Sequence, residues 1–552
     1  MFPAFSFICM GLRLASAFTL ALLGSFLFAV IVGLMLFFEV VSLTVAVGAV
    51  IVVNLLVWLV SPRINDFMYR YLYDMRWVTL EELRSLSPES ARVVERVTDD
   101  YGYSTPKFGI IHDRNPNAFT YGSGRWNSRI FMTEGCFEFL DDEEVASVMA
   151  HELGHVTNRD FIVMTIANTV VQILYLIAIY SWRFGQRGRN RAATALFGIA
   201  VLSYIFYFVG EYMVLYLSRV REYYADEFAA EYTDPDAMST ALVKVAYGIL
   251  VTDEDKELVN ATKNIGLMNP KTSRDEGLAY HNSGRSVDAE SALAQSFLFD
   301  LKNPWARLGE LRSTHPLTGK RVKRLSKMSV HPVFDFDEIL RRNPIDMRRM
   351  YREFLTDVGA LFLPTLVAVG FPLIYLGAAV AQFVALDIFL FAGGWLAVVG
   401  VALLARNFYK YPRGEAEDET VLGLLADPYA SPVRGKNVSL DGELIGRGQA
   451  GYRLSEDLMF KDETGLMYLR YESWLPVLGN LFFAVSKVPD LVGEKVEIDG
   501  WFLRGTSQHV AMLRLRAPGE SVKSYVHISG LVLGALLLVI GVAVLGIGVA
   551  VV

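Results

Sequence analysis

The stretch His151-Glu152-Leu153-Gly154-His155 is the part of the sequence from which the fold can best be argued. On a helix, residues four apart lie on one face, so His151 and His155 can bind the same metal ion. Glu152, next to the first histidine, can then accept a proton from a metal-bound water. The chain has only eight histidines among 552 residues, so a chance match is expected in about one per cent of such chains. The stretch therefore predicts a peptidase site with one Zn²⁺ per chain.

The neighbouring residues predict the helix that this site requires. Asp141 is a good N-cap residue, and Glu144 follows three residues later, as in a capping box. Val148 and Met149 follow at the spacing of a buried helical stripe. We therefore expect a helix over residues 141–160 with its apolar side in a protein core.

The composition predicts a membrane protein. Hydrophobic residues make up 53% of the chain, which excludes an ordinary soluble protein. Seven apolar runs reach the length of about 20 residues that crosses a bilayer, at 14–38, 40–60, 161–182, 192–217, 358–383, 388–405 and 528–552. The first two predict a helical hairpin anchor, because the first run is too long for a typical signal peptide and the second follows at once. A cleaved leader is the alternative.

Basic residues beside these runs predict the orientation, because cytoplasmic flanks carry an excess of lysine and arginine. Such residues follow the second run, precede the fifth and follow the sixth, at Arg63, Arg70, Arg76, Arg341, Arg342, Arg348, Arg349, Arg352, Arg406, Lys410 and Arg413. If every run spans, these flanks share one side with the metal helix, so the site is expected to face the cytoplasm. The arginine-rich loop 183–191 would then lie outside, against this bias, unless the third and fourth runs form a shallow hairpin.

Two strands are expected before the metal helix. Residues 107–111 and 129–133 have strand character and bracket the turn-rich stretch 115–124. A strand edge in this place can hold an extended substrate by β-augmentation. A plain hairpin without any substrate contact fits the same residues.

A third metal ligand is expected after the fourth apolar run. Glu222 and Asp226 are four residues apart and share a helical face. In this place Glu222 could bind zinc, and Asp226 could orient a ligand histidine. Taken alone, such a pair is more often a solvated helical face.

Taken together, these residues resemble the HtpX-type membrane metalloproteases, which are relatives of the type I CAAX prenyl proteases. The resemblance covers roughly residues 10–330 and rests on His151 to His155, on Asn117-Ala118-Phe119, on Glu222-x-x-x-Asp226, and on Ser313-Thr314-His315-Pro316 with Arg321. It implies the zinc ligands His151, His155 and Glu222, with Glu152 as general base. It also implies that Asn117, Ala118 and Phe119 line the substrate cleft. His315 is placed near the site, where it either helps to stabilise the oxyanion or only caps and packs a helix.

The resemblance also implies a function. The expected fold is mainly α, with a zincin-like catalytic domain that includes a small sheet. The expected activity is hydrolysis of peptide bonds in misfolded or membrane proteins, as quality control of the cytoplasmic membrane. Processing of one defined substrate, as the prenyl proteases do, is an alternative. A second alternative is an inactive membrane scaffold that recruits partners.

The resemblance ends near residue 330, and the C-terminal part has β character. Segments with strand patterns lie at 438–445, 458–461, 466–471, 496–503 and 510–515, which predicts a small OB-like barrel. Nucleic-acid binders of this kind need a basic groove. Basic residues do not dominate here and the net charge is −7, so a protein partner is expected and nucleic acid is not.

The expected organisation combines these segments. Membrane hairpins at 1–62, 161–217 and 354–406 alternate with catalytic parts at 63–160 and 218–353, followed by the OB-like domain at 407–527 and a transmembrane helix at 528–552. The stretch 260–304 within the second catalytic part is expected to be a mobile loop over the site or a disordered insertion. The expected partners are the lipid bilayer and protein or peptide substrates.

Overall fold

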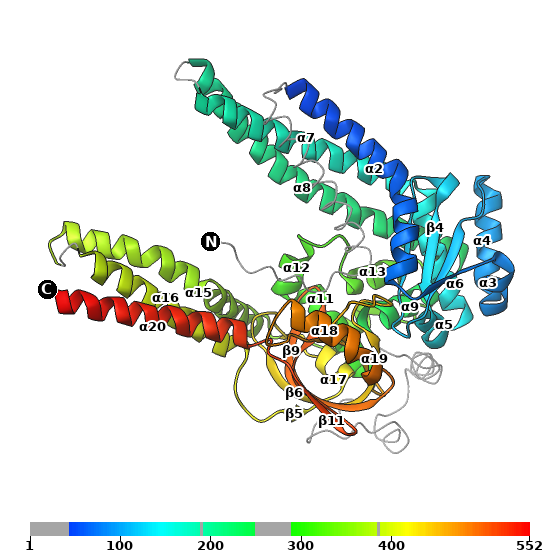
Figure 1. Ribbon diagram of the computed structural model, residues 1–552. Helices are drawn as coiled ribbons and strands as arrows, with labels where there is room; N and C mark the ends of the chain where they lie inside the picture. Colours follow the sequence, from blue (N-terminus) through cyan, green and yellow to red (C-terminus); the bar gives the residue numbers. More distant parts are fainter. Residues whose placement is uncertain (1–42, 188–190, 249–288, 384–386, 552) are drawn as a thin grey trace. The chain divides into compact units, whose positions relative to one another are not determined.

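The structure is a computed structural model that describes residues 43–187, 191–248, 289–383 and 387–551 (Figure 1). The chain divides into two compact units. The first comprises Met1–Asn264, Leu308–Phe336 and Gln449–Leu454, and the second comprises Ile265–Arg307, Asp337–Gly448 and Ser455–Val552. Most elements in both units are helices.

Six of the helices are long and apolar enough to cross a membrane. They are α2 (Leu43–Leu72), α7 (Asp160–Arg187), α8 (Arg191–Tyr232), α15 (Met347–Val380), α16 (Ile388–Lys410) and α20 (Ile528–Val551). Six of the seven expected runs coincide with these helices, and the first run lies outside the described residues. The protein is therefore a multi-pass membrane protein.

A four-stranded sheet forms the centre of the first unit. Its strands are β1 (Met75–Val78), β2 (Lys107–Ile111), β3 (Ala118–Tyr121) and β4 (Arg129–Thr133), in the order β1-β2-β4-β3. The two expected strands are confirmed as β2 and β4. They are parallel, with Lys107 opposite Arg129, so they do not form a hairpin. The turn-rich stretch between them instead contains β3, which pairs antiparallel with β4 at the end of the sheet.

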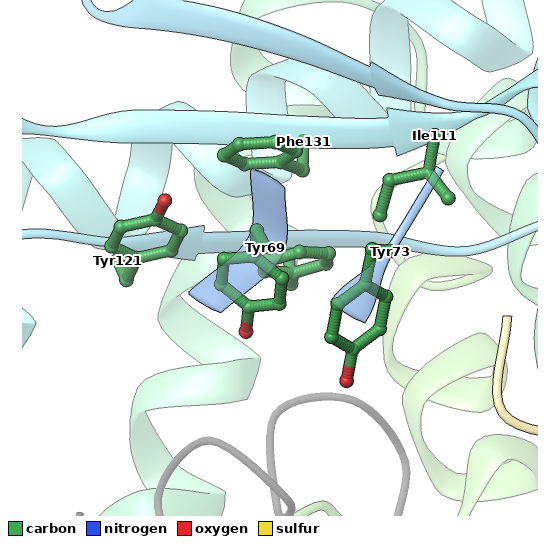
Figure 2. Close-up of a cluster of buried hydrophobic side chains, with 6 residues drawn as sticks. Tyr69, Tyr73, Ile111, Tyr121 and Phe131 are labelled. Atoms are coloured by element: carbon green, nitrogen blue, oxygen red, sulfur yellow. The ribbon is translucent and has the colours of Figure 1, made fainter. Parts of the chain in front are cut away.

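Aromatic side chains join this sheet to the last turns of α2 (Figure 2). The ring of Phe119 stacks on Phe131 with centroids 5.2 Å apart, and Tyr69 of α2 lies 5.3 Å from Phe119. Gly109 makes room for this packing, because a Cβ there would stand 2.2 Å from the Phe131 ring. The sheet is thus packed directly against a membrane helix.

Short helices complete the first unit around the sheet. They are α3 (Leu80–Leu86), α4 (Pro88–Tyr101), η1 (Arg125–Asn127), α5 (Glu134–Phe139), α6 (Asp142–Thr157), α9 (Pro235–Leu242), η2 (Val243–Tyr247) and α13 (Thr318–Leu325). The expected metal helix is confirmed as α6.

The segment Gln449–Leu454 also belongs to the first unit, although it comes from the C-terminal part of the sequence. Its Tyr452 ring lies 5.4 Å from the ring of Tyr73. The backbone N–H of Gly451 donates to Oδ2 of Asp113 at 2.7 Å. Gly451 has a φ of +69°, and a Cβ there would stand 2.1 Å from Cγ2 of Ile111. Only glycine suits this position without a local shift.

The second unit contains a closed barrel of five strands. They are β6 (Lys436–Arg447), β7 (Leu458–Lys461), β8 (Leu466–Arg470), β9 (Lys495–Arg504) and β10 (Gln508–Ala517). The strands close in the order β6-β7-β8-β10-β9-β6, and β8 pairs with β10 in parallel. The five expected strands are therefore confirmed. The short β5 (Glu417–Asp418) and β11 (Glu520–Lys523) extend the sheet.

The remaining helices lie in the second unit or cross its boundaries in the sequence. They are α11 (Ala289–Lys302), α12 (Pro304–Glu310), α14 (Phe336–Arg342), α17 (Val421–Leu425), α18 (Leu478–Ser486) and α19 (Val488–Leu491). The expectation of a mobile loop at 260–304 is wrong for its last part, because Ala289–Lys302 forms α11 and buries Phe297 and Phe299. Residues 260–288 lie outside the described residues.

Glycines allow α16 and α20 to pack closely. A Cβ on Gly534 would stand 2.9 Å from Cγ of Leu404, and one on Gly541 would stand 2.4 Å from the backbone N of Ala397. Small residues that let two backbones approach are typical of helix pairs in membranes.

Candidate metal centre

The helix α6 begins with the capping box that the sequence predicts. The N–H of Glu144 donates to Oδ1 of Asp141 at 2.9 Å, and the N–H of Asp141 donates to Oε2 of Glu144 at 2.9 Å. The same Glu144 accepts from Nζ of Lys244 at 2.7 Å in a buried ion pair. These contacts fix the start of the helix that carries the two histidines.

Gly154 brings α6 close to α8. A Cβ at Gly154 would stand 3.2 Å from Cα of Ala225, so a larger residue would push the two helices apart. Ala225 lies between Glu222 and Asp226 in the sequence. The close approach therefore carries both acidic residues of α8 to the histidines of α6.

His151, His155 and Glu222 form a buried cluster that could hold a metal ion. The Nε2 atoms of His151 and His155 lie 3.2 Å apart. Carboxylate oxygens of Glu222 lie 3.7 Å from Nε2 of His151 and 3.6 Å from Nε2 of His155. Zinc ligands at their usual bond lengths stand about 3.3 Å apart at the corners of a tetrahedron. The three residues therefore fit one zinc ion, as the sequence predicts.

Asp226 lies behind His151. Its Oδ1 is 3.0 Å from Nδ1 of His151, which leaves Nε2 directed at the metal position. Arg321 donates to both oxygens of Asp226, from Nε at 2.8 Å and from Nη2 at 2.6 Å. Burial alone would lower the pKa of His151, but Asp226 and Glu222 beside the ring raise it above its ordinary value.

His155 has a matching acidic contact that the sequence analysis missed. Oδ2 of Asp160 lies 2.7 Å from Nδ1 of His155, and the carboxylate of Asp160 also contacts the guanidinium of Arg221. A backbone break between the two helices makes this contact possible, since Arg159 has a φ of +56°. An acid five residues after the second histidine, directly beyond the helix end, is the signal that could have identified it.

His315 lies at the open side of the cluster. Its Nδ1 is 2.8 Å from Oε2 of Glu222, and its side chain is 38% exposed. Arg219 orders the preceding turn, because Nη1 donates to the carbonyl oxygens of Glu310 and Ser313, each at 2.8 Å. This contact places His315 beside a candidate metal ligand.

The stretch Asn117, Ala118 and Phe119 lies at the sheet edge next to α6. The N–H of Asn117 donates to Oγ1 of Thr133 at 2.8 Å, and Ala118 is opposite Met132 in β4. Among the described residues, the other edge of β3 has no strand partner. The side chain of Phe119 is buried in the aromatic core, whereas Asn117 and Ala118 are only half-buried.

Comparison with known proteins covers the part of the chain that carries this cluster. The family model described as Peptidase family M48 matches residues 85–329. A protein named "Protease HtpX homolog" from Pyrococcus abyssi is 29% identical over 276 residues, 49% of this chain and 83% of the relative. A protein of the same name from Methanothermobacter thermautotrophicus is 33% identical over 189 residues, 34% of this chain and 67% of the relative. Another from Aquifex aeolicus is 28% identical over 305 residues, 52% and 89% of the two chains.

Among solved structures, Ste24p of S. mikatae aligns with 57% of this chain and 65% of its own, with 16% identity and a TM-score of 0.35. That score is too low to establish a shared fold. The family match, in contrast, contains every residue of the metal cluster, and the barrel lies beyond it. The chain therefore belongs to peptidase family M48, as an HtpX-type membrane metalloprotease.

Proposed function

We propose that the protein is a zinc-dependent endopeptidase that cleaves misfolded or membrane proteins at the cytoplasmic face of the cell membrane. The observation that carries this proposal is the buried set of His151, His155 and Glu222, whose ligand atoms are spaced as zinc requires. Two histidines on one helix and a glutamate from a later helix support a zincin-like catalytic unit. Three protein ligands leave a fourth position for water, as in catalytic zinc sites.

In this mechanism Glu152 is the general base. Zinc, when bound, would lower the pKa of a water and polarise the scissile carbonyl. Glu152 takes the proton from the attacking water and passes it to the nitrogen of the leaving amine, so it ends the cycle as a carboxylate. Its buried position beside His151 keeps this carboxylate away from bulk solvent.

The neighbouring residues orient the ligands and the substrate. Asp226, held by Arg321, fixes the ring of His151. We propose that His315 donates a hydrogen bond to the oxyanion that forms as water attacks, because it lies at the open side of Glu222. The substrate backbone would pair with the free edge of β3 and extend past the metal.

The basic flanks of the membrane helices support a cytoplasmic site. The barrel has five strands, a parallel β8–β10 pair, and helices between β8 and β9. We infer from this connectivity that it is an OB-like domain. Its expected ligand is a protein partner.

A glutamine variant of the base tests the proposal. Glu152→Gln should retain zinc, measured by metal analysis of the purified protein, while casein cleavage falls by about 10²–10⁴-fold. A chelator should abolish cleavage by the wild type, and added zinc should restore it. Wild-type rates in Glu152→Gln would refute the peptidase mechanism. The inactive protein, kept in native membranes, should also retain uncleaved substrates, which would distinguish broad quality control from processing of one substrate.

A further inference from the structure

Large apolar side chains are exposed in the second unit in the loop after β8 and at the first residue of α18. Trp474, Leu475, Val477 and Leu478 expose 64%, 61%, 80% and 73% of their surface. Four such residues within a stretch of five form a contiguous patch, which we call the apolar tip (residues 474–478). Contiguous apolar surface on a folded domain indicates that something covers it.

Hydrogen bonds connect the residues beside the apolar tip to the segment just before α20. The N–H of Tyr525 donates to the carbonyl oxygen of Glu472 at 2.7 Å, and the N–H of Glu472 donates to Oγ of Ser524 at 3.1 Å. The rings of Trp474 and Tyr525 lie 5.7 Å apart, edge to face. Tyr525 precedes the first residue of α20 by three positions. The tip therefore lies at the level where α20 begins.

The end of α16 lies at this same level. A Cβ on Gly530 of α20 would stand 2.3 Å from Oδ1 of Asn407 in α16, so the last turn of α16 is next to the first turn of α20. Both helices are apolar enough to span a membrane. The tip therefore lies beside the ends of two helices that could span a membrane.

Cationic side chains gather at the same level. Arg406 and Lys410 lie one turn apart on α16, Arg413 follows the helix, and Arg470 ends β8. Arg470 of β8 is opposite Ala511 of β10, two residues beyond His509. In the part of the chain that the structure describes, Arg470 has Glu472 at 3.9 Å, while Arg406, Lys410 and Arg413 form no ion pair.

We propose that the apolar tip is a membrane anchor, which inserts Trp474, Leu475, Val477 and Leu478 among the headgroups of acidic phospholipids beside α16 and α20. Tryptophan and tyrosine favour the boundary between headgroups and acyl chains. Basic residues attract the phosphates of anionic lipids, and exposed aliphatic side chains enter the boundary beneath them. The inference concerns the barrel and is independent of the peptidase mechanism.

Fluorescence quenching in vesicles tests the anchor. The full-length protein with Cys9→Ser, which keeps the buried Cys136, receives a single bimane-labelled cysteine in place of Leu475 or Val477. The vesicles contain phosphatidylcholine and phosphatidylglycerol, with spin-labelled lipids as quenchers near the interface. We expect quenching of at least half that of a label at Ser529, in the first turn of α20. Removal of phosphatidylglycerol should reduce the quenching.

The negative control is a label at the exposed Glu494. This residue precedes β9, whose far end pairs with His509 near the cations, so it lies about 30 Å away along the strand. Quenching at Leu475 no stronger than at Glu494 would overturn the proposal. Excimers between pyrene labels at Val477, without quenching by lipid, would identify a second copy as the occupant. Protection from iodide without quenching by lipid would identify a protein partner, and either result overturns the membrane anchor.

The double variant Val477→Asp with Leu478→Asp separates anchoring from folding. Both side chains are exposed, so the variant should fold, bind zinc and cleave casein in detergent like the parent. Quenching of the label at Leu475 should fall about threefold, because aspartates are repelled by anionic headgroups and do not enter the acyl-chain boundary as Val477 and Leu478 would. Unchanged quenching in this variant would also overturn the proposal.

Discussion

The two units bury charged side chains in different ways. In the first unit, buried carboxylates meet arginines around one centre, as Asp226 does with Arg321 and Asp160 with Arg221. Each pair stands behind one histidine of the metal cluster. Burying such ions costs solvation energy that their attraction offsets only in good geometry. Their arrangement here suits the orientation of metal ligands.

In the second unit, the most deeply buried arginine, Arg504, contacts backbone carbonyls and an aromatic ring. Arg504 donates to the carbonyl oxygens of Leu425 and Ser296, the latter at 2.9 Å, and its guanidinium lies 4.3 Å from the ring centre of Phe299. These contacts join the barrel to two helices and direct no group at an open site. Charged side chains are buried in both units, but they contact different groups. In the first unit they contact the histidines of the metal cluster, and in the second unit Arg504 contacts backbone carbonyls and an aromatic ring.

The largest expected effect is the loss of zinc affinity when Glu222, the proposed third ligand, is replaced. Glu222→Gln should weaken zinc binding by about 10³-fold, or about 4 kcal/mol, and abolish cleavage, because an amide is a poorer ligand than a carboxylate. Zinc titration with a competing chelator measures this. Glu227→Gln, one residue beyond Asp226 and paired with Arg324, is the matched control and should retain zinc. A Glu222→Gln variant that binds zinc normally would contradict the assignment.

The next effect tests whether the C-terminal sequence is needed by the first unit. Gly451→Ala should lower the free energy of unfolding by about 2–4 kcal/mol, because the positive φ disfavours alanine and its Cβ would collide with Ile111. Gly519→Ala, at a φ of +81° with no atom within 4 Å, should cost only about 1 kcal/mol. Thermal unfolding in detergent compares the two. Equal shifts would mean that segment 449–454 adds nothing to the first unit.

A smaller effect is expected at the contact that the sequence analysis missed. Asp160→Asn should weaken zinc binding by about 10–100-fold, because the ring of His155 loses a charged acceptor. Asp357→Asn alters a buried aspartate of the second unit, which accepts from Trp305 and Tyr409. It should leave zinc affinity unchanged even if the protein becomes less stable. Equal zinc affinities in the two variants would show that Asp160 does not support zinc binding through His155.

The smallest effect depends on pH and concerns the second unit, where it amounts to at most about 2 kcal/mol within the measured window of pH 5–7. The lowered pKa of His509, about 3, means that the unfolded chain binds a proton below about pH 6.5 while the folded chain does not. Its contribution to stability is therefore lost as pH falls from 6.5 toward 3, by at most about 1.4 kcal/mol per pH unit. His509→Gln should remove this slope. Burial raises the pKa of Asp457 to about 7, which acts in the opposite sense, so the measurement is wild type minus variant across pH 5–7.

Features with a local cause could be predicted from the sequence. The capping box of Asp141 and Glu144 and the pair of histidines one turn apart depend on residues within a single helix. The five barrel strands also follow from local alternation. The approach of Glu222 to the histidines joins residues far apart in the chain. The sequence pattern made Glu222 a candidate ligand by its place after the fourth apolar run, and the resemblance to a family then assigned it.

Other features depend on contacts that the sequence pattern does not contain. β2 pairs in parallel with β4, and β3, which lies between them in the sequence, pairs antiparallel with the other side of β4. This arrangement depends on contacts between strands and not on the pattern within any one of them. The contact between Asp160 and His155 depends on the backbone of Arg159 at the helix break. Segment 449–454 joins the first unit through Tyr73 and Ile111, more than 300 residues earlier in the printed sequence. Such long-range pairing has no periodic signal along the chain.

The continuity of α8 has a mechanical consequence. The helix runs without a break from Arg191 to Tyr232 over 42 residues, about 63 Å, so Glu222 is carried by the same rod that crosses the bilayer. A change of about 5° in the tilt of this rod would move the carboxylate by about 2 Å relative to a pivot in mid-membrane. Helix tilt follows bilayer thickness. The geometry of the third ligand, and with it the cleavage rate, should therefore vary with the acyl-chain length of the surrounding lipids.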